Sequence, residues 1–317
     1  MKIGLVLPLA EYPSGQPSYA EIRALALQAE GAGFDSVWVF DHLLFRAADG
    51  TSEGIWESWT VLSALAEATD RVELGTLVLC TAFRNPAVLA KMAVTLDEVS
   101  GGRLILGLGC GWHEPEFDAF GVPFDHRVER FEEALRIVSS LLRTGRADMT
   151  GRHYRVGGGE LRPLGPRAGG PPLLVGAHRP RMTALAARYA DLWNSCWFGS
   201  PEGACDALAR IREACGREGR DPASLGLTLG VNVAVDAAAD AAVDGENEPR
   251  GPAPAGTDVL TGSPEAVARG LRRYESLGVA HLILNLNPHD SAAQRSLATA
   301  VRLYRAGARF PAAEVKQ

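Results

Sequence analysis

The stretch IGLVLPLAEYPSGQPSYAEIRALALQAEGAGFDSVWVF, residues 3–40, contains one complete strand–helix–strand unit and decides the fold. It begins with an apolar run at residues 3–7 and ends with another at residues 36–40. Between them, Ser18 and Glu21 have the spacing of a helix capping box, and apolar residues follow at helical spacing. Two short apolar strands joined by a helical crossover indicate a parallel sheet with both faces covered.

The same unit recurs to the end of the chain. Strand-length apolar runs occur at residues 3–7, 36–40, 72–79, 103–108, 173–175, 192–195, 225–235 and 281–286. A helix is expected after each, at about residues 19–31, 57–69, 86–100, 127–142, 181–189, 201–216, 264–277 and 291–304. Eight such units predict an α/β protein with a closed (β/α)8 TIM barrel, in a single domain over residues 1–317. An open doubly wound sheet is the alternative, but it rarely needs eight regular units.

Two insertions interrupt this pattern. Residues 143–172 contain eight glycines and four prolines, so we expect mostly loop, with a short strand at residues 153–156. Residues 236–258 contain six acidic residues and one basic residue, with few large apolar side chains. Such a segment does not build a core, and we expect either a lid over a substrate or a loose loop.

The composition excludes several classes of function. The formal net charge is −6, from 38 acidic and 32 basic residues, which argues against nucleic-acid or anionic-membrane partners. No apolar run approaches the roughly 20 residues that a membrane helix needs. The five cysteines are an odd number without a C-x-x-C pair, so we interpret them as free thiols in a reducing compartment. We therefore expect a cytoplasmic protein.

The active sites of such barrels form where strands end, so candidate residues are expected at those positions. Asp41 and His42 follow the second expected strand, and an imidazole beside a carboxylate can exchange protons near neutral pH. A structural hydrogen bond at the strand end is the alternative. After the fifth strand, the sequence Gly-Ala-His-Arg precedes a helix, and this helix start suits a phosphate. An ordinary turn would have the same sequence.

The fourth strand ends in glycines at positions 107, 109 and 111, followed by Trp112 and His113. This spacing is not the dinucleotide pattern G-x-G-x-x-G. The glycines could let a flat ring approach the backbone, or they could only permit tight packing. Trp112 could form the wall of a pocket. The acidic residues that follow, including Glu116, are interpreted as a solvated acidic turn, and we expect no metal site.

The residues that several other kinds of catalysis require are not found in the expected positions. Lys2 and Lys91 do not follow strands, so a Schiff-base lysine is not expected. The seven histidines show neither H-x-H nor H-E-x-x-H spacing, and no G-x-S-x-G motif is present. A barrel without these groups often takes its chemistry from a cofactor.

The chain resembles the bacterial-luciferase-like (LLM class) flavin- and deazaflavin-dependent oxidoreductases across nearly its whole length. The resemblance lies in residues 32–39 leading into Asp41 and His42, and in residues 84–91, 96–103, 107–114, 131–135, 151–154, 186–194 and 262–267. The family fold is the eight-fold barrel. The resemblance implies a cofactor across the strand ends, with coenzyme F420 favoured by the Asp-His pair and FMN as the alternative.

The same resemblance implies site residues. Asp41 and His42 would approach the ring as the catalytic pair, and Val78 and Leu79 would form a strand bulge behind it. The implied cofactor contacts are Val78, Leu79, Gly109, Gly111, Gly176, Ala177, His178 and Arg179, and Trp112 and His113 would line the substrate pocket. Trp112 stands where the sugar-phosphate dehydrogenases of the family have a glutamate, so a sugar phosphate is not expected as substrate.

Three functions remain open. The first is F420-dependent hydride transfer to or from a small organic substrate. The second is an FMN monooxygenase that uses dioxygen and receives reduced FMN from a separate flavin reductase. The third is a cofactor-binding barrel without catalysis. The resemblance also implies a homodimer through the second and third helices, where Leu89, Met92 and Leu96 serve either that contact or packing on the barrel.

Overall fold

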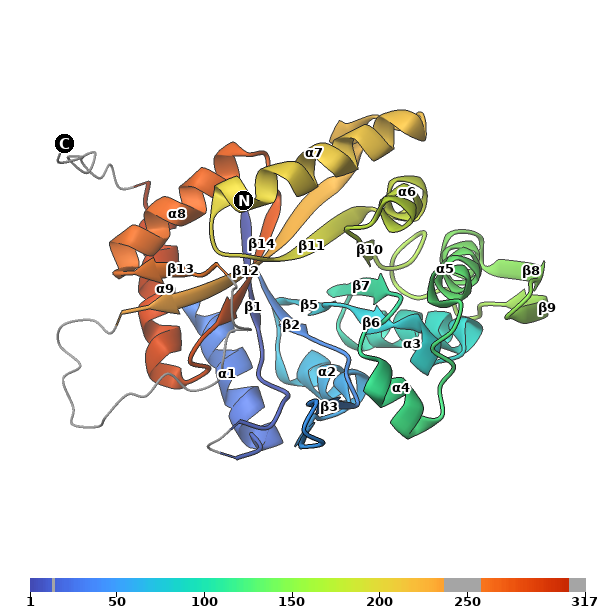
Figure 1. The fold of residues 1–317 in the computed structure, drawn as a ribbon, viewed down its shortest axis with the longest axis horizontal. Helices are drawn as coiled ribbons and strands as arrows, with labels where there is room; N and C mark the ends of the chain where they lie inside the picture. The colour runs from blue at the N-terminus through green and yellow to red at the C-terminus, as the bar shows by residue number, and fades with distance from the viewer. Residues whose placement is uncertain (13–14, 237–257, 308–317) are drawn as a thin grey trace.

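The computed structural model of the protein describes residues 1–12, 15–236 and 258–307, and its centre is a closed barrel (Figure 1). The barrel strands are β1 (Lys2–Val6), β2 (Ser36–Val39), β5 (Glu73–Thr76), β7 (Leu104–Gly109), β10 (Leu173–Gly176), β11 (Leu192–Phe198), β12 (Gly226–Val235) and β14 (His281–Leu286). They pair in parallel in chain order, and the β7–β10 and β14–β1 pairings complete the ring. The predicted (β/α)8 barrel is confirmed.

Helices surround the barrel where the sequence predicts them. They are α1 (Tyr19–Ala32), α2 (Ser58–Ala68), α3 (Pro86–Val99), α5 (Arg127–Thr144), α6 (Pro180–Tyr189), α7 (Pro201–Arg217), α8 (Pro264–Ser276) and α9 (Ser291–Arg305). The predicted capping box forms at the start of α1, since Ser18 Oγ accepts the Glu21 N–H and the Glu21 carboxylate accepts the Ser18 N–H. No helix within the described residues is long and apolar enough to cross a membrane.

Short elements add to this plan at the strand ends. Strand β6 (Leu79–Cys80) continues the path of β5 along β7, and β13 (Leu260–Gly262) pairs with β12. Strands β3 (Leu44–Arg46) and β4 (Ser52–Gly54) form a small hairpin after β2. Helix α4 (Glu114–Phe120) and the 3-10 turns η1 (Thr81–Phe83) and η2 (Pro222–Ser224) complete the described elements.

Residues 143–172 are mostly loop, as predicted, and the strand expected at residues 153–156 overlaps one of two strands that the structure places there. The segment forms an antiparallel hairpin of β8 (Arg146–Thr150) and β9 (Arg155–Glu160), beside α5 in Figure 1. The carboxylate of Glu133 on α5 accepts the backbone N–H groups of three successive turn residues, 152 to 154, at 2.8–2.9 Å. This long-range anchor holds the turn in place despite the glycines. Of the second insertion, residues 237–257 lie outside the described residues.

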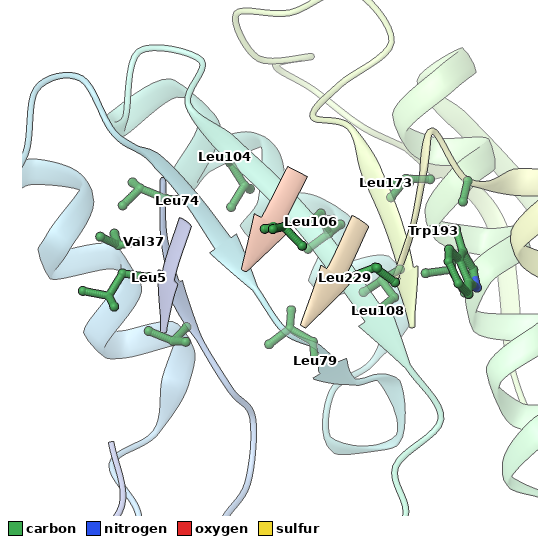
Figure 2. Packing of buried hydrophobic residues seen from close by; sticks show 14 of the residues in the cluster. Leu5, Val37, Leu74, Leu79, Leu104, Leu106, Leu108, Leu173, Trp193 and Leu229 are labelled. Atoms are coloured by element: carbon green, nitrogen blue, oxygen red, sulfur yellow. The ribbon is translucent and has the colours of Figure 1, made fainter. Parts of the chain in front are cut away.

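The outer surface of the barrel carries the larger apolar core. Figure 2 shows buried side chains of this layer, among them Leu5, Val37, Leu74, Leu104, Leu106, Leu108, Leu173, Trp193 and Leu229. Leu89 and Leu96 of α3 are buried in the same layer, and Met92 packs partly against it. Packing on the barrel therefore accounts for these three residues, and the homodimer stays a prediction.

A second, smaller cluster fills the inside of the barrel. Its buried members are Val6, Trp38, Leu77, Ile105, Leu174 and Ile283. Trp38 takes the most room, because a Cβ atom added at Gly75 would overlap its ring and one at Gly4 would lie 2.5 Å from its Nε1. The barrel is thus solid at the level of Trp38. A ligand site must lie beyond it, at the carboxyl ends of the strands.

A buried polar chain closes the opposite end of the barrel. The Trp38 indole N–H donates to Ser36 Oγ at 2.7 Å, and Ser36 Oγ lies 2.8 Å from His281 Nε2. His281 is 3% exposed, and its burial, with smaller contributions from Lys2 and the N-terminus, lowers its pKa to about 3. The imidazole is therefore neutral in the folded protein near neutral pH.

Candidate active site

The Asp41 carboxylate, directly after β2, connects several segments at the carboxyl ends of the strands. It accepts hydrogen bonds from Ser58 Oγ at 2.7 Å and from the Cys80 N–H at 2.9 Å. The Arg84 guanidinium donates to both oxygens, at 2.7 and 3.0 Å, and also pairs with Glu57. Although burial opposes it, this set of bonds raises the pKa of Arg84. Both oxygens of Asp41 are therefore engaged away from His42.

His42 has a different carboxylate partner, Glu116 on α4. The two side chains are joined by a 2.8 Å contact between His42 Nδ1 and Glu116 Oε1. The other Glu116 oxygen accepts the Leu43 N–H at 2.8 Å. The Glu116 side chain is 1% exposed, so the interpretation of this residue as part of a solvated acidic turn is wrong. Helix α4 turns it inward, and the pair fixes both the ring of His42 and the proton on its Nδ1.

An aromatic wall surrounds His42. The ring centroid of Phe45 lies 4.5 Å from that of His42, and the indole of Trp112 meets His42 edge-on at 5.4 Å. His113 packs against Phe45 at 5.7 Å, and its Nε2 accepts the Arg46 N–H at 3.0 Å. Burial, with a smaller contribution from His42, lowers the pKa of His113. Trp112 itself is 64% exposed, which leaves its outer face free for a ligand.

The strand pairing carries one extra residue between β5 and β6. Gly75 pairs with Ile105 and Leu79 with Leu108, so four steps along one strand match three along its neighbour. The irregularity falls at Leu77 and Val78, whose peptide bond is cis. This is a β-bulge by definition, at the place where the resemblance implies one. Its place behind a cofactor ring stays a prediction.

The Val78 side chain occupies the space that two strand-end glycines leave open. A Cβ atom at Gly109 would lie 2.5 Å from Val78 Cγ2, and one at Gly176 would lie 3.2 Å from both Val78 methyl groups. Gly111 has a φ of +74°, and a Cβ there would lie 2.5 Å from the Phe117 ring. Close packing therefore explains these glycines. The Val78 side chain, and not bare backbone, forms the surface at this point. A ring contact at Gly109 or Gly111 stays a prediction.

The segment that joins β10 to α6 separates into two parts. Ala177 is buried and its backbone is used within the sheet, since its N–H donates to the Asn194 carbonyl at 2.9 Å. His178 and Arg179 are exposed, and the side chain of Arg179, the N-cap residue of α6, makes no capping hydrogen bond. The helix start and the guanidinium are thus available to an anion.

Seven of the twelve predicted site residues form two groups at the same barrel end. His42, Trp112 and His113 meet in the aromatic wall, while Val78, Leu79, Gly109 and Gly176 meet around the bulge. The sequence analysis gave no site role to three residues of this region: Arg84, Phe45 and Glu116, the last of which it interpreted as solvated. Within the described residues, no group of three or more His, Cys, Asp or Glu side chains is arranged to hold a metal ion.

Comparisons with known proteins agree with this architecture. A family model described as luciferase-like monooxygenase matches residues 1–250. The pyrimidine monooxygenase RutA of Stutzerimonas stutzeri is 30% identical over 244 residues, which are 71% of this chain and 66% of that protein. The phthiodiolone/phenolphthiodiolone dimycocerosates ketoreductase of Mycobacterium tuberculosis H37Rv is 36% identical over 228 residues, 66% of this chain and 59% of that protein. The chain thus spans less than two thirds of the length of these relatives.

Two solved structures share the fold. An F420-dependent secondary alcohol dehydrogenase in complex with an F420-acetone adduct superimposes with a TM-score of 0.77 and 19% identity, covering 96% of this chain and 99% of that one. The monooxygenase RslO1 from Streptomyces bottropensis gives a TM-score of 0.75 and 22% identity, covering 97% and 100%. At these identities the likeness concerns the fold alone.

Proposed function

Because this chain belongs to the family of luciferase-like monooxygenases, we propose that it is an oxidoreductase that uses coenzyme F420 for hydride transfer to or from a small organic substrate. The observation that carries the proposal is the His42–Glu116 pair, a proton-transfer group held at the strand ends by a buried carboxylate. The name of one fold relative includes F420 and acetone, which makes secondary alcohols and their ketones the first substrates to test.

The residues at the barrel mouth fit a planar ring with an anionic tail. Val78 offers an apolar surface at the bulge, next to the Cβ-less positions Gly109 and Gly176. Arg179 and the start of α6 offer the positive charge and N–H groups that a phosphate needs. When bound, F420 would supply a hydride donor or acceptor within its ring. The Val78 side chain would support the ring, while the Leu79 side chain is buried in the outer core and Leu79 could contribute only its backbone; residues 176–179 would hold the phosphate.

The role of His42 follows from its contact with Glu116. The carboxylate keeps the proton on Nδ1, which leaves Nε2 to accept a proton when the ring is neutral and to donate one when it is charged. Substrate oxidation and reduction both require this proton transfer at an oxygen atom. Asp41 acts as a positioning residue, because Arg84, Ser58 and Cys80 hold its oxygens and thereby fix the backbone next to His42.

The aromatic wall supplies the remaining part of the site. Phe45, Trp112 and His113 surround the His42 ring and exclude water from one side of it. A substrate held against the exposed face of Trp112 would lie next to His42. These side chains favour a substrate with apolar groups.

A second candidate is a monooxygenase that uses reduced FMN and dioxygen, with a separate flavin reductase. The family description and the name of the RutA relative favour it. The same mouth residues would hold FMN, because both molecules combine a planar ring with a phosphate. Oxygen consumption that requires both reduced FMN and substrate would distinguish this reaction from hydride transfer.

The test is a titration of the purified protein with F420 and with FMN, followed by turnover of secondary alcohols. We expect F420 binding, and a loss of turnover of about 10²- to 10⁴-fold in His42→Ala with cofactor affinity nearly unchanged. His126→Asn is the matched control, since this exposed histidine at the start of α5 has a left-handed backbone that asparagine tolerates. FMN binding without F420 binding would refute the F420 assignment. Full turnover in His42→Ala would refute the role of His42.

A further inference from the structure

A buried amide inside the barrel lacks a hydrogen-bond partner. Asn232 on β12 is 4% exposed, and its Oδ1 accepts a hydrogen bond from Asn285 Nδ2 on β14 at 2.9 Å. Its own Nδ2 makes no hydrogen bond with any residue that the structure describes. Such a donor is costly to bury, so natural proteins keep one only where something else satisfies it.

The strand register directs this amide pair to the interior. Gly230 pairs with Ile283, and Ile283 belongs to the cluster that fills the barrel. Asn232 pairs with Asn285 two residues further along both strands, so both amides point to the same side as Ile283. Because the strands are parallel, this step leads toward their carboxyl ends. The pair therefore lies between the solid interior and the mouth.

Residues of β11 face the interior next to β12, the strand of Asn232. A Cβ atom at Gly230 would lie 2.5 Å from the Cys196 Cβ and 2.9 Å from the Trp197 ring, so both residues turn inward from β11. Trp197 packs against the interior cluster, as do Phe40 directly after β2 and Val78 between β5 and β6. Cys196 nevertheless stays exposed to solvent. The inner wall of the mouth on this side thus has an aromatic face, an accessible thiol and two amides.

We propose that Asn232 and Asn285 form a hydrogen-bonding wall of the ligand chamber, in which Asn232 Nδ2 donates to a carbonyl oxygen of the bound molecule. This inference rests on the proposed function. The two amides bring no charge that could neutralise a buried carboxylate, so the acceptor is an uncharged carbonyl. Two molecules of that function carry one: the cofactor, on the pyrimidine part of its ring, and a ketone or aldehyde substrate.

The test replaces the donor and keeps the volume. Asn232→Leu has nearly the same size and no polar group, and Asn232→Ala is a second variant in case the first does not fold. Gln294→Leu is the matched control, because Gln294 on α9 is another buried amide with an unpaired atom, Oε1, but its Nε2 donates to the Leu25 carbonyl outside the barrel. Circular dichroism checks the fold of each variant. F420 and FMN are titrated by fluorescence, and acetone is then titrated into the complex.

We expect about tenfold weaker binding of one of these probes to both Asn232 variants, the loss of roughly one hydrogen bond, with the control unchanged. Weaker cofactor binding assigns the acceptor to the ring. Unchanged cofactor binding with weaker acetone binding assigns it to the substrate. Equal affinities for all three probes would overturn the inference, since a trapped water would then satisfy the amide. Wild-type protein that binds neither cofactor would instead refute the proposed function, and this inference with it.

Discussion

Lowering the pH from 7 to 5 is expected to decrease the free energy of unfolding by about 2 kcal/mol through one side chain, His281. This histidine is buried, and its pKa is lowered to about 3 in the folded protein. Ser36 accepts the indole N–H of Trp38, so its hydroxyl proton is free to be donated to His281 Nε2. A proton on Nε2 would remove that acceptor as well as place a charge in the barrel.

The sign and size follow from proton linkage. An unfolded histidine has a pKa of about 6.5 and takes up a proton as the pH falls, whereas the folded one stays neutral until about pH 3. The unfolded state therefore gains stability below about pH 6.5, at up to about 1.4 kcal/mol per pH unit. Between pH 7 and 5 the free energy of unfolding therefore decreases by about 2 kcal/mol.

Urea titrations followed by tryptophan fluorescence at pH 7, 6 and 5 measure the effect. His281→Gln carries a neutral amide at all three values, so it should start less stable but lose about 2 kcal/mol less than wild type on acidification. His178→Gln, which changes an exposed histidine, is the control and should behave like wild type. His289, whose burial lowers its pKa to about 4, is present in all three proteins and cancels in the comparison. Equal losses in wild type and His281→Gln would refute the reasoning.

Three further predictions concern the mouth and its support. Arg84→Met leaves the buried Asp41 carboxylate without its cation and should lower the free energy of unfolding by about 3–5 kcal/mol in urea titrations; a loss below 1 kcal/mol would contradict the anchoring role. Gly107→Ala places a methyl group onto the Thr76 carbonyl oxygen, and no side-chain movement can relieve that overlap. The free energy of unfolding should decrease by about 3 kcal/mol, which lowers the melting temperature. An unchanged melting temperature would count against this packing. Trp112→Ala removes an exposed side chain, so stability should change by no more than about 0.5 kcal/mol while the KM for alcohols rises; an unchanged KM would remove Trp112 from the substrate pocket.

The fold could be predicted because its signals are local and repeated. The strand expected at residues 36–40 is found at Ser36–Val39, and the helix expected at 57–69 is found at Ser58–Ala68. The hairpin within residues 143–172 could not be predicted in the same way. Its composition favours loop. The hydrogen bonds that hold its turn come from Glu133 on α5, a residue outside the segment, so the segment's own sequence carries no signal for them.

The site was harder to predict, because neighbours in sequence are not partners in space. Asp41 and His42 follow one strand, and successive side chains at a strand end point in different directions. Asp41 consequently binds Arg84, and His42 binds Glu116. A local signal for Glu116 did exist, since Pro115 and the acidic first turn are typical of a helix start and Gly121 of its end.

The anchoring of Asp41 has a consequence for engineering. The residue connects the end of β2 to the start of α2, to the end of β6 and to the segment before α3, all of which belong to the scaffold. The backbone beside His42 is therefore held by these elements. Libraries that randomise residues 46–56 and keep Phe45 would change the loop after β2 while leaving the His42 ring held by Glu116 and Phe45.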